Sequence, residues 1–181
     1  MEYFYVDGGK IIGLFVTIVA MWHVLGFAFG LVYINFSLRS LFNLIPYDRQ
    51  WSKVIRSADL HLWISGSILI ALGSLQKGTE EYLSNPKLWC KVTVVVIWFL
   101  STQLMRRVGI PNLKKGDTGP MMKLSAINIG CWIYGAFLGC AKPLSDGVVS
   151  YSEFILGFIC TIILSFLSLY YIKKHGCVSR S

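Results

Sequence analysis

Five long apolar runs make up most of the 181 residues of this chain. They lie near residues 11–36, 58–75, 88–105, 124–141 and 152–172. A helix that crosses about 30 Å of hydrocarbon needs roughly 20 predominantly apolar residues, and each run is close to that length. The sequence therefore predicts an all-α fold, an integral membrane five-helix bundle that forms a single transmembrane domain over residues 1–181.

The composition agrees with this class. Hydrophobic residues are 55% of the chain and charged residues 14%, which lies outside the range of soluble globular domains. The first apolar run follows Glu2, Asp7 and Lys10, so it lacks the basic region that precedes the apolar core of a signal peptide, and it is longer than such a core. We expect it to be an uncleaved first helix.

The basic residues alternate between crowded and sparse connections. Twelve lie in the first and third connections between runs and in the C-terminal tail: Arg39, Arg49, Lys53, Arg56, Arg106, Arg107, Lys114, Lys115, Lys123, Lys173, Lys174 and Arg180. Five lie on the other side: Lys10, Lys77, Lys87, Lys91 and Lys142. Because cytoplasmic connections carry the excess of Lys and Arg, the pattern predicts an outside N-terminus and a cytoplasmic C-terminus.

The acidic residues follow the opposite distribution. Three lie on the predicted cytoplasmic side, Asp48, Asp59 and Asp117, and the other six lie outside: Glu2, Asp7, Glu80, Glu81, Asp146 and Glu153. The net charge of +8 is thus explained by a cytoplasmic membrane face. The sequence predicts the lipid bilayer as a partner and no nucleic acid.

The cysteines and prolines indicate a helical bundle without disulfides, thiolate metal sites or prolines inside its helices. Five cysteines occur, an odd number, and none forms a CxxC pair, so we expect neither a disulfide nor a thiolate metal site. All five prolines are predicted outside helix interiors: Pro46, Pro86, Pro111, Pro120 and Pro143. Residues 109–119, GIPNLKKGDTG, are expected to form a loop beside anionic lipid head groups.

Two glycine pairs have the spacing that lets helices approach closely in lipid. Gly26 and Gly30 lie in the first span, and Gly135 and Gly139 in the fourth. Packing within one chain is the first interpretation of these pairs, and a homo-oligomer is the second.

Ionisable side chains inside spans are costly in lipid and are therefore candidates for function. His23 lies deep in the first span, His61 follows Asp59 at the start of the second, and Lys91 lies about one turn inside the third. His23 is interpreted either as a neutral imidazole bonded to another helix or as a ligand or proton carrier. Lys91 can also reach the outer surface with its amine.

Depth along the helices limits which of these groups could share a cofactor. At about 1.5 Å per residue, His23 lies roughly 24 Å from Arg39, so it is in the outer third of the bilayer if Arg39 marks the inner surface. Lys91 is then near the same level. If residues 11–36 are instead centred in the bilayer, His23 is at mid-depth and Lys91 does not reach its level. His61 is expected near the inner surface, which is too far from His23 for the two to share a cofactor in either case.

Several stretches are similar to one family. These are His23 with the Gly-rich and aromatic run to Arg39, the second span with Gly66 and Gly73, and PKLWCK at residues 86–91. Over roughly residues 15–105 the chain resembles the CopD/HemJ-like superfamily of small bacterial membrane proteins. The stretch KGTEEYLSNPKLWCK at residues 77–91 is most similar to an uncharacterised branch, and Lys142 with Pro143 resembles the end of the fourth HemJ helix.

The resemblance implies specific site residues. HemJ is a protoporphyrinogen oxidase that binds haem b, and its first-helix His and third-helix Lys match His23 and Lys91. The chain departs from HemJ in the fourth span, where KLSAIN at residues 123–128 stands in place of an Arg-x-x-Asn-Glu-x-Pro motif. The departure counts against porphyrinogen oxidation more than against the fold.

The sequence thus leads to one function and two alternatives. The first is a haem b protein of the bacterial cytoplasmic membrane that ligates iron through His23, with Lys91 as second ligand, and exchanges electrons with a membrane redox partner or quinone. No catalytic residue is identified. The second is copper or small-cation uptake, as in CopD, for which Met21 with His23 and Met121 with Met122 are the candidate ligands. The third is a non-catalytic membrane partner subunit.

Overall fold

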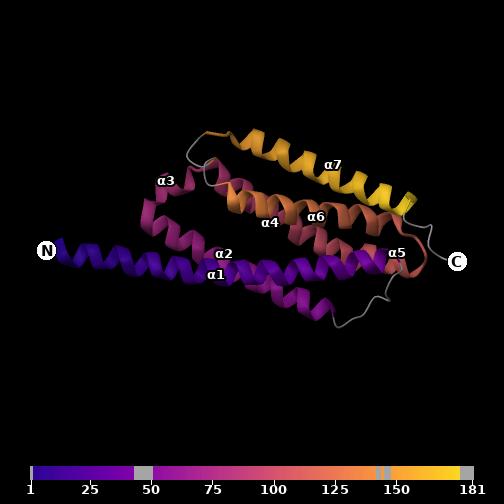
Figure 1. Ribbon diagram of the computed structural model, residues 1–181, viewed down its shortest axis with the longest axis horizontal. Coiled ribbons are helices and arrows are strands. Elements are labelled where there is room, and N and C mark those ends of the chain that lie inside the picture. The colour runs from indigo at the N-terminus through magenta and orange to yellow at the C-terminus, as the bar shows by residue number, and fades with distance from the viewer. Residues whose placement is uncertain (1, 43–50, 142–143, 145–147, 176–181) are drawn as a thin grey trace. The chain divides into compact units, whose positions relative to one another are not determined.

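A computed structural model describes residues 2–42, 51–141, 144 and 148–175. Its regular elements in these ranges are all helical (Figure 1). The contacts divide the chain into two compact units. Unit 1 comprises residues 1–33 and 48–84, unit 2 comprises residues 34–47 and 85–181, and the boundary falls within the first helix.

Five helices are long and apolar enough to cross a membrane, as predicted. The spans are Lys10–Phe36, Ser57–Lys77, Pro86–Lys114, Gly119–Cys140 and Tyr151–His175. Large apolar side chains are exposed on every one of them, including Leu14, Leu60, Leu100, Ile133 and Leu164. A soluble protein would bury such surfaces, whereas lipid tails accept them. The prediction of a single transmembrane domain stays a prediction.

Unit 1 is built from three helices. It holds most of α1 (Glu2–Leu41), α2 (Trp51–Lys77) and the short α3 (Thr79–Leu83). Gly78 has φ 85°, a left-handed conformation that glycine adopts without strain, and it turns the chain from α2 into α3. The ring of Tyr82 then lies directly over Gly73 of α2, where an added Cβ would be 2.5 Å from ring carbons.

Unit 2 contains the other spans. These are α4 (Pro86–Leu104), the π-helix η1 (Met105–Gly109), α5 (Ile110–Lys114), α6 (Gly119–Cys140) and α7 (Tyr151–His175). Helix α6 packs along both α4 and α7, as Figure 1 shows. Asn85 caps α4 by accepting from the Lys87 amide, and Ser150 and Glu153 form a reciprocal capping box at the start of α7.

The connection expected at residues 109–119 is mostly helical, so that prediction was wrong. The third span continues from α4 through η1 and α5 to Lys114 before the chain turns. Pro120 occupies the first turn of α6, where the missing amide hydrogen has no intrahelical acceptor to lose, and Pro111 is the second residue of α5, directly after the π-turn η1. Proline at these positions is therefore a helix-start signal. Pro46 and Pro143 lie outside the described residues.

A buried apolar cluster holds together the end of unit 2 that contains η1 and α5. It combines the end of α1 with side chains of η1, α5, α6 and α7: Leu41, Met105, Ile110, Met121, Met122, Ala126 and Leu169. The candidate copper ligands Met121 and Met122 are thus part of a hydrophobic core. Flexible methionine side chains commonly fill such cores.

Candidate functional site around His23

A hydrogen-bonded chain joins the two histidines of unit 1. The Nδ1 atom of His23 on α1 lies 2.8 Å from the hydroxyl of Ser65 on α2, and Ser65 is fully buried. The same hydroxyl lies 2.6 Å from the backbone carbonyl oxygen of His61. One serine therefore links α1 to the backbone of α2 at His61.

The direction of these bonds determines the protonation of the His23 ring. A carbonyl oxygen can only accept, so Ser65 must donate its single proton to His61. Ser65 then accepts from His23, which places a hydrogen on Nδ1. In the neutral ring the lone pair is consequently on Nε2. A histidine oriented in this way is the usual form of a metal ligand, whose other ring nitrogen donates to a protein acceptor.

Each histidine ring faces a glycine of the opposite helix. An added Cβ at Gly66 of α2 would lie 3.7 Å from the Cε1 atom of His23, and one at Gly26 of α1 would lie 3.2 Å from the Cδ2 atom of His61. The His61 ring also meets Trp22 edge-on, with centroids 4.5 Å apart. Gly26 therefore allows two helices of the same chain to pack closely. This is the first of the two interpretations given for the glycine pairs.

The expected separation of His61 from His23 was wrong. The ring of His61 lies against Trp22 and Gly26, the neighbours of His23 in sequence and on the helix. The depth argument placed the start of α2 near the inner surface, but α2 begins at Trp51, so His61 is already in its third turn. Asp59, two residues before His61, is only 7% exposed.

The predicted ligands His23 and Lys91 belong to different units. His23 is half-buried in unit 1, whereas Lys91 is exposed on α4 in unit 2. The buried lysine of α4 is Lys87, one turn earlier, whose amine donates to the carbonyl of Ala141 at the end of α6. The assignment of Lys91 as a second ligand stays a prediction.

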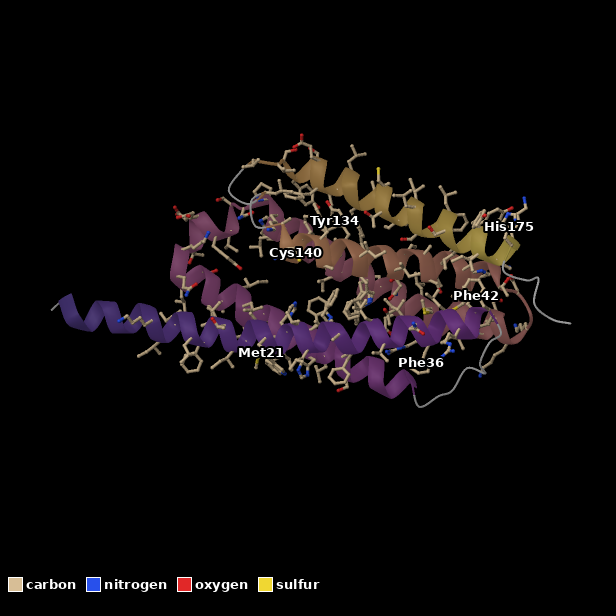
Figure 2. The ribbon with its side chains drawn as sticks, in the orientation of Figure 1. Met21, Phe36, Phe42, Tyr134, Cys140 and His175 are labelled. Atoms are coloured by element: carbon tan, nitrogen blue, oxygen red, sulfur yellow. The ribbon has the colours of Figure 1, made fainter. Side chains whose placement is uncertain are left out.

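The candidate copper ligands on α1 do not meet. Met21 and His23 are two residues apart, and side chains at that spacing point to different faces of a helix. Met21 is 62% exposed, and Figure 2 labels it on α1. Among the described residues no group of three or more His, Cys, Asp or Glu side chains could hold a metal ion.

The structure buries several polar residues that were not predicted as candidates from the sequence. Ser65 and Lys87 are two of them, and Asn128, within the KLSAIN stretch, is a third. Each is a polar residue in an apolar span, and that was the available signal. Ser65 and Asn128 carry no charge and so were not expected as candidates, and Lys87 was expected in the connection before the predicted span at residues 88–105.

Four cysteines are described, and none of them is in a disulfide: Cys90 and Cys131 are buried, and Cys140 and Cys160 are exposed. Cys177 and the Lys142–Pro143 pair lie outside the described residues.

Compared with family models, with curated proteins and with solved structures, the chain matches none of them. The resemblance to the CopD/HemJ-like superfamily therefore stays a prediction that depends on short motifs.

Proposed function

We propose that this chain is a multi-pass protein of the bacterial cytoplasmic membrane that binds a b-type haem through His23 and takes part in electron transfer. The observation that supports this best is the bond from His23 Nδ1–H to Ser65, because a ligating histidine usually donates its other ring nitrogen to a protein acceptor in this way. His23 would hold the haem iron through its imidazole, a donor type that iron accepts. When bound, haem supplies a one-electron redox couple.

Ser65 is the positioning residue in this proposal. Its hydroxyl holds the plane of the imidazole and the tautomer, and it is itself held by the His61 carbonyl. Gly66 lets the His23 ring lie close to the α2 backbone. The partner is a membrane redox protein or a quinone, and Lys91 is the candidate second ligand.

The test is the visible spectrum of detergent-purified protein after haem addition, oxidised and then reduced. We expect a Soret band with reducible α and β bands in the wild type and their loss in His23→Ala. His175→Ala is the matched control, because His175 ends α7 and stacks on Tyr171, with ring centroids 4.4 Å apart.

Ser65→Ala separates positioning from ligation. The variant should keep the haem bands, but with a shifted midpoint potential or a several-fold weaker haem affinity, as when an outer partner of a ligating histidine is removed. A colourless wild type, or a His23→Ala protein with full haem content, would contradict the proposal. Metal uptake that depends on His23 without any chromophore would favour the cation-uptake alternative.

A further inference from the structure

A row of polar side chains runs along the contact between α4 and α6, inside otherwise apolar helices. We call Trp98, Ser101, Thr102, Ser125 and Asn128 the polar seam. Each is at most 4% exposed. Asn128 Nδ2 donates to the Ser101 hydroxyl at 2.9 Å and to the Thr102 hydroxyl at 3.2 Å, and Ser101 donates to the Trp98 carbonyl at 2.8 Å.

Both ends of the polar seam have polar atoms that the described protein leaves without a hydrogen bond. These atoms are the indole Nε1 of Trp98 and the hydroxyl of Ser125. An unsatisfied buried donor is costly anywhere and more so where lipid surrounds the helices. Native proteins usually satisfy such groups, so each of these two calls for a partner.

The Ser125 hydroxyl also lacks the local bond that many hydroxyls in the described helices form. Seven other serines and threonines donate to a carbonyl three or four residues back: Thr17, Ser65, Ser74, Thr93, Ser101, Thr161 and Ser165. Ser125 does not take this bond, although a helical serine can reach it at little cost. Its hydroxyl therefore has hydrogen-bonding capacity that no described group uses.

The register of the two helices locates the ends of the polar seam. Contacts pair Trp98 with Trp132, Thr102 with Asn128 and Gly109 with Met121, so Ser125 lies level with Met105. Seven residues separate Trp98 from Met105, which is about 10 Å along the helix. The Ser125 end thus coincides with the start of η1, and π-turns are frequent at functional sites.

Water is the molecule whose size and hydrogen bonding fit these buried polar groups. A buried water needs two to four polar partners. Ser101 is one turn from Trp98, and its oxygen can accept a second hydrogen bond. Asn128 is one turn from Ser125, and its amide oxygen is not used by the two bonds of Nδ2. The packing is too tight for a larger molecule at the nearby Gly109, where an added Cβ would lie 3.1 Å from Met121 Sδ.

We propose that the polar seam is an internal water-binding site, with one water between Trp98 and Ser101 and another between Asn128 and Ser125. The bound waters complete a hydrogen-bonded path about 10 Å long inside the α4–α6 pair. The path lies wholly in unit 2, so it does not depend on haem binding at His23 in unit 1.

Nuclear magnetic resonance of protein labelled with 15N-tryptophan tests the Trp98 end. The Trp98 indole signal is identified by its loss in Trp98→Phe. We expect direct cross-relaxation between this indole proton and water. An indole proton without that signal, or with cross-relaxation to a bound organic molecule, would overturn the site at Trp98.

Thermal unfolding of Ser125→Ala tests the other end. The control is Ser165→Ala, which removes a buried hydroxyl that already donates to the Thr161 carbonyl at 2.8 Å. If Ser125 holds a water, its removal lowers the melting temperature by a few degrees more than the control does. If the hydroxyl has no partner, Ser125→Ala raises the melting temperature, and this result would overturn the site at Ser125. Neither measurement requires haem.

Discussion

Two lysines one turn apart on α4 have different surroundings. Lys87 is buried and donates to the Ala141 carbonyl, whereas Lys91 is exposed. The position of Lys87 in the first turn of α4 is unfavourable for a positive charge, since the helix dipole is positive there. The end of α6 offsets this effect, because its last carbonyls carry partial negative charge and lack helical donors.

The first prediction compares these lysines. Lys87→Met should destabilise the protein by about 1–3 kcal/mol, because the buried Ala141 carbonyl loses the amine donor and keeps only the long 3.3 Å bond from the Leu144 amide. Lys91→Met should change stability by less than about 0.5 kcal/mol, as is usual at exposed positions. Denaturant unfolding in detergent measures both. Equal effects of the two changes would contradict the assignment of Lys87 as the cap of α6.

At the scale of helices, glycine contacts decide which faces pack. An added Cβ at Gly130 of α6 would lie 3.0 Å from the Cα atom of Ile162 on α7, whereas at Gly139 nothing described lies within 4 Å. The α6–α7 contact therefore depends on Gly130, a residue outside the predicted glycine pair. Tyr134 strengthens the same contact by donating to the Phe154 carbonyl at 2.6 Å (Figure 2).

The second prediction concerns this contact. Gly130→Ala should cost about 1–3 kcal/mol, because the methyl group would lie 2.7 Å from Ile162 Cγ1 and 3.0 Å from its Cα atom, and the α7 backbone would have to move. Gly139→Ala is the matched control on the same helix and should be tolerated. The midpoint of denaturant unfolding distinguishes them, and a neutral Gly130→Ala would show that α6 and α7 do not pack this closely.

The third prediction concerns the docking of α3 on α2. Burial raises the pKa of Tyr82 from its usual value of 10.0, because the ring lies over Gly73. The neutral phenol is the form that burial favours. Its contribution to docking is therefore complete below pH 10 and is lost as pH rises through the raised pKa. In Gly73→Ala the displaced ring should titrate nearer 10.0.

An ultraviolet titration of tyrosinate, taken as the difference between each protein and its Tyr82→Phe version, measures this shift. If Tyr82 ionised at the same pH in the wild type and in the Gly73→Ala variant, its burial against Gly73 would be disproved.

For the whole molecule, the basic residues predict the orientation in the membrane. The fourth prediction is that alkaline phosphatase fused after His175 is inactive, because the enzyme works only after export and the C-terminus is expected in the cytoplasm. A fusion after Ser84, in the connection with Glu80 and Glu81, should be active. The reverse pattern of activities would invert the topology.

The number and approximate limits of the spans were predictable. A hydrocarbon layer about 30 Å thick imposes a helix length, and the five apolar runs meet it. The continuation through Pro111 to Lys114 was not predicted, because proline marks either a loop or the first turn of a helix. The preceding π-turn at Met105–Gly109 has no comparable sequence signal.

The candidate site was predictable only in part. His23 was singled out because a lone imidazole among apolar neighbours is costly in lipid. Its hydrogen-bond partner Ser65 was not singled out. Helical periodicity shows which residues share a face, but it does not show which face of α2 meets α1. Ser65, eight residues before Gly73 and four after His61, looks in sequence like any serine of a span.

The sequence by itself determined the class of this protein, since length and hydrophobicity of each run are local properties that a bilayer selects directly. Only the tertiary structure decided which polar groups meet. It paired His23 with Ser65, buried Lys87 in place of Lys91, and joined Asn128 to Ser101. These pairs depend on the register and rotation of neighbouring helices, and side-chain packing across each interface sets both.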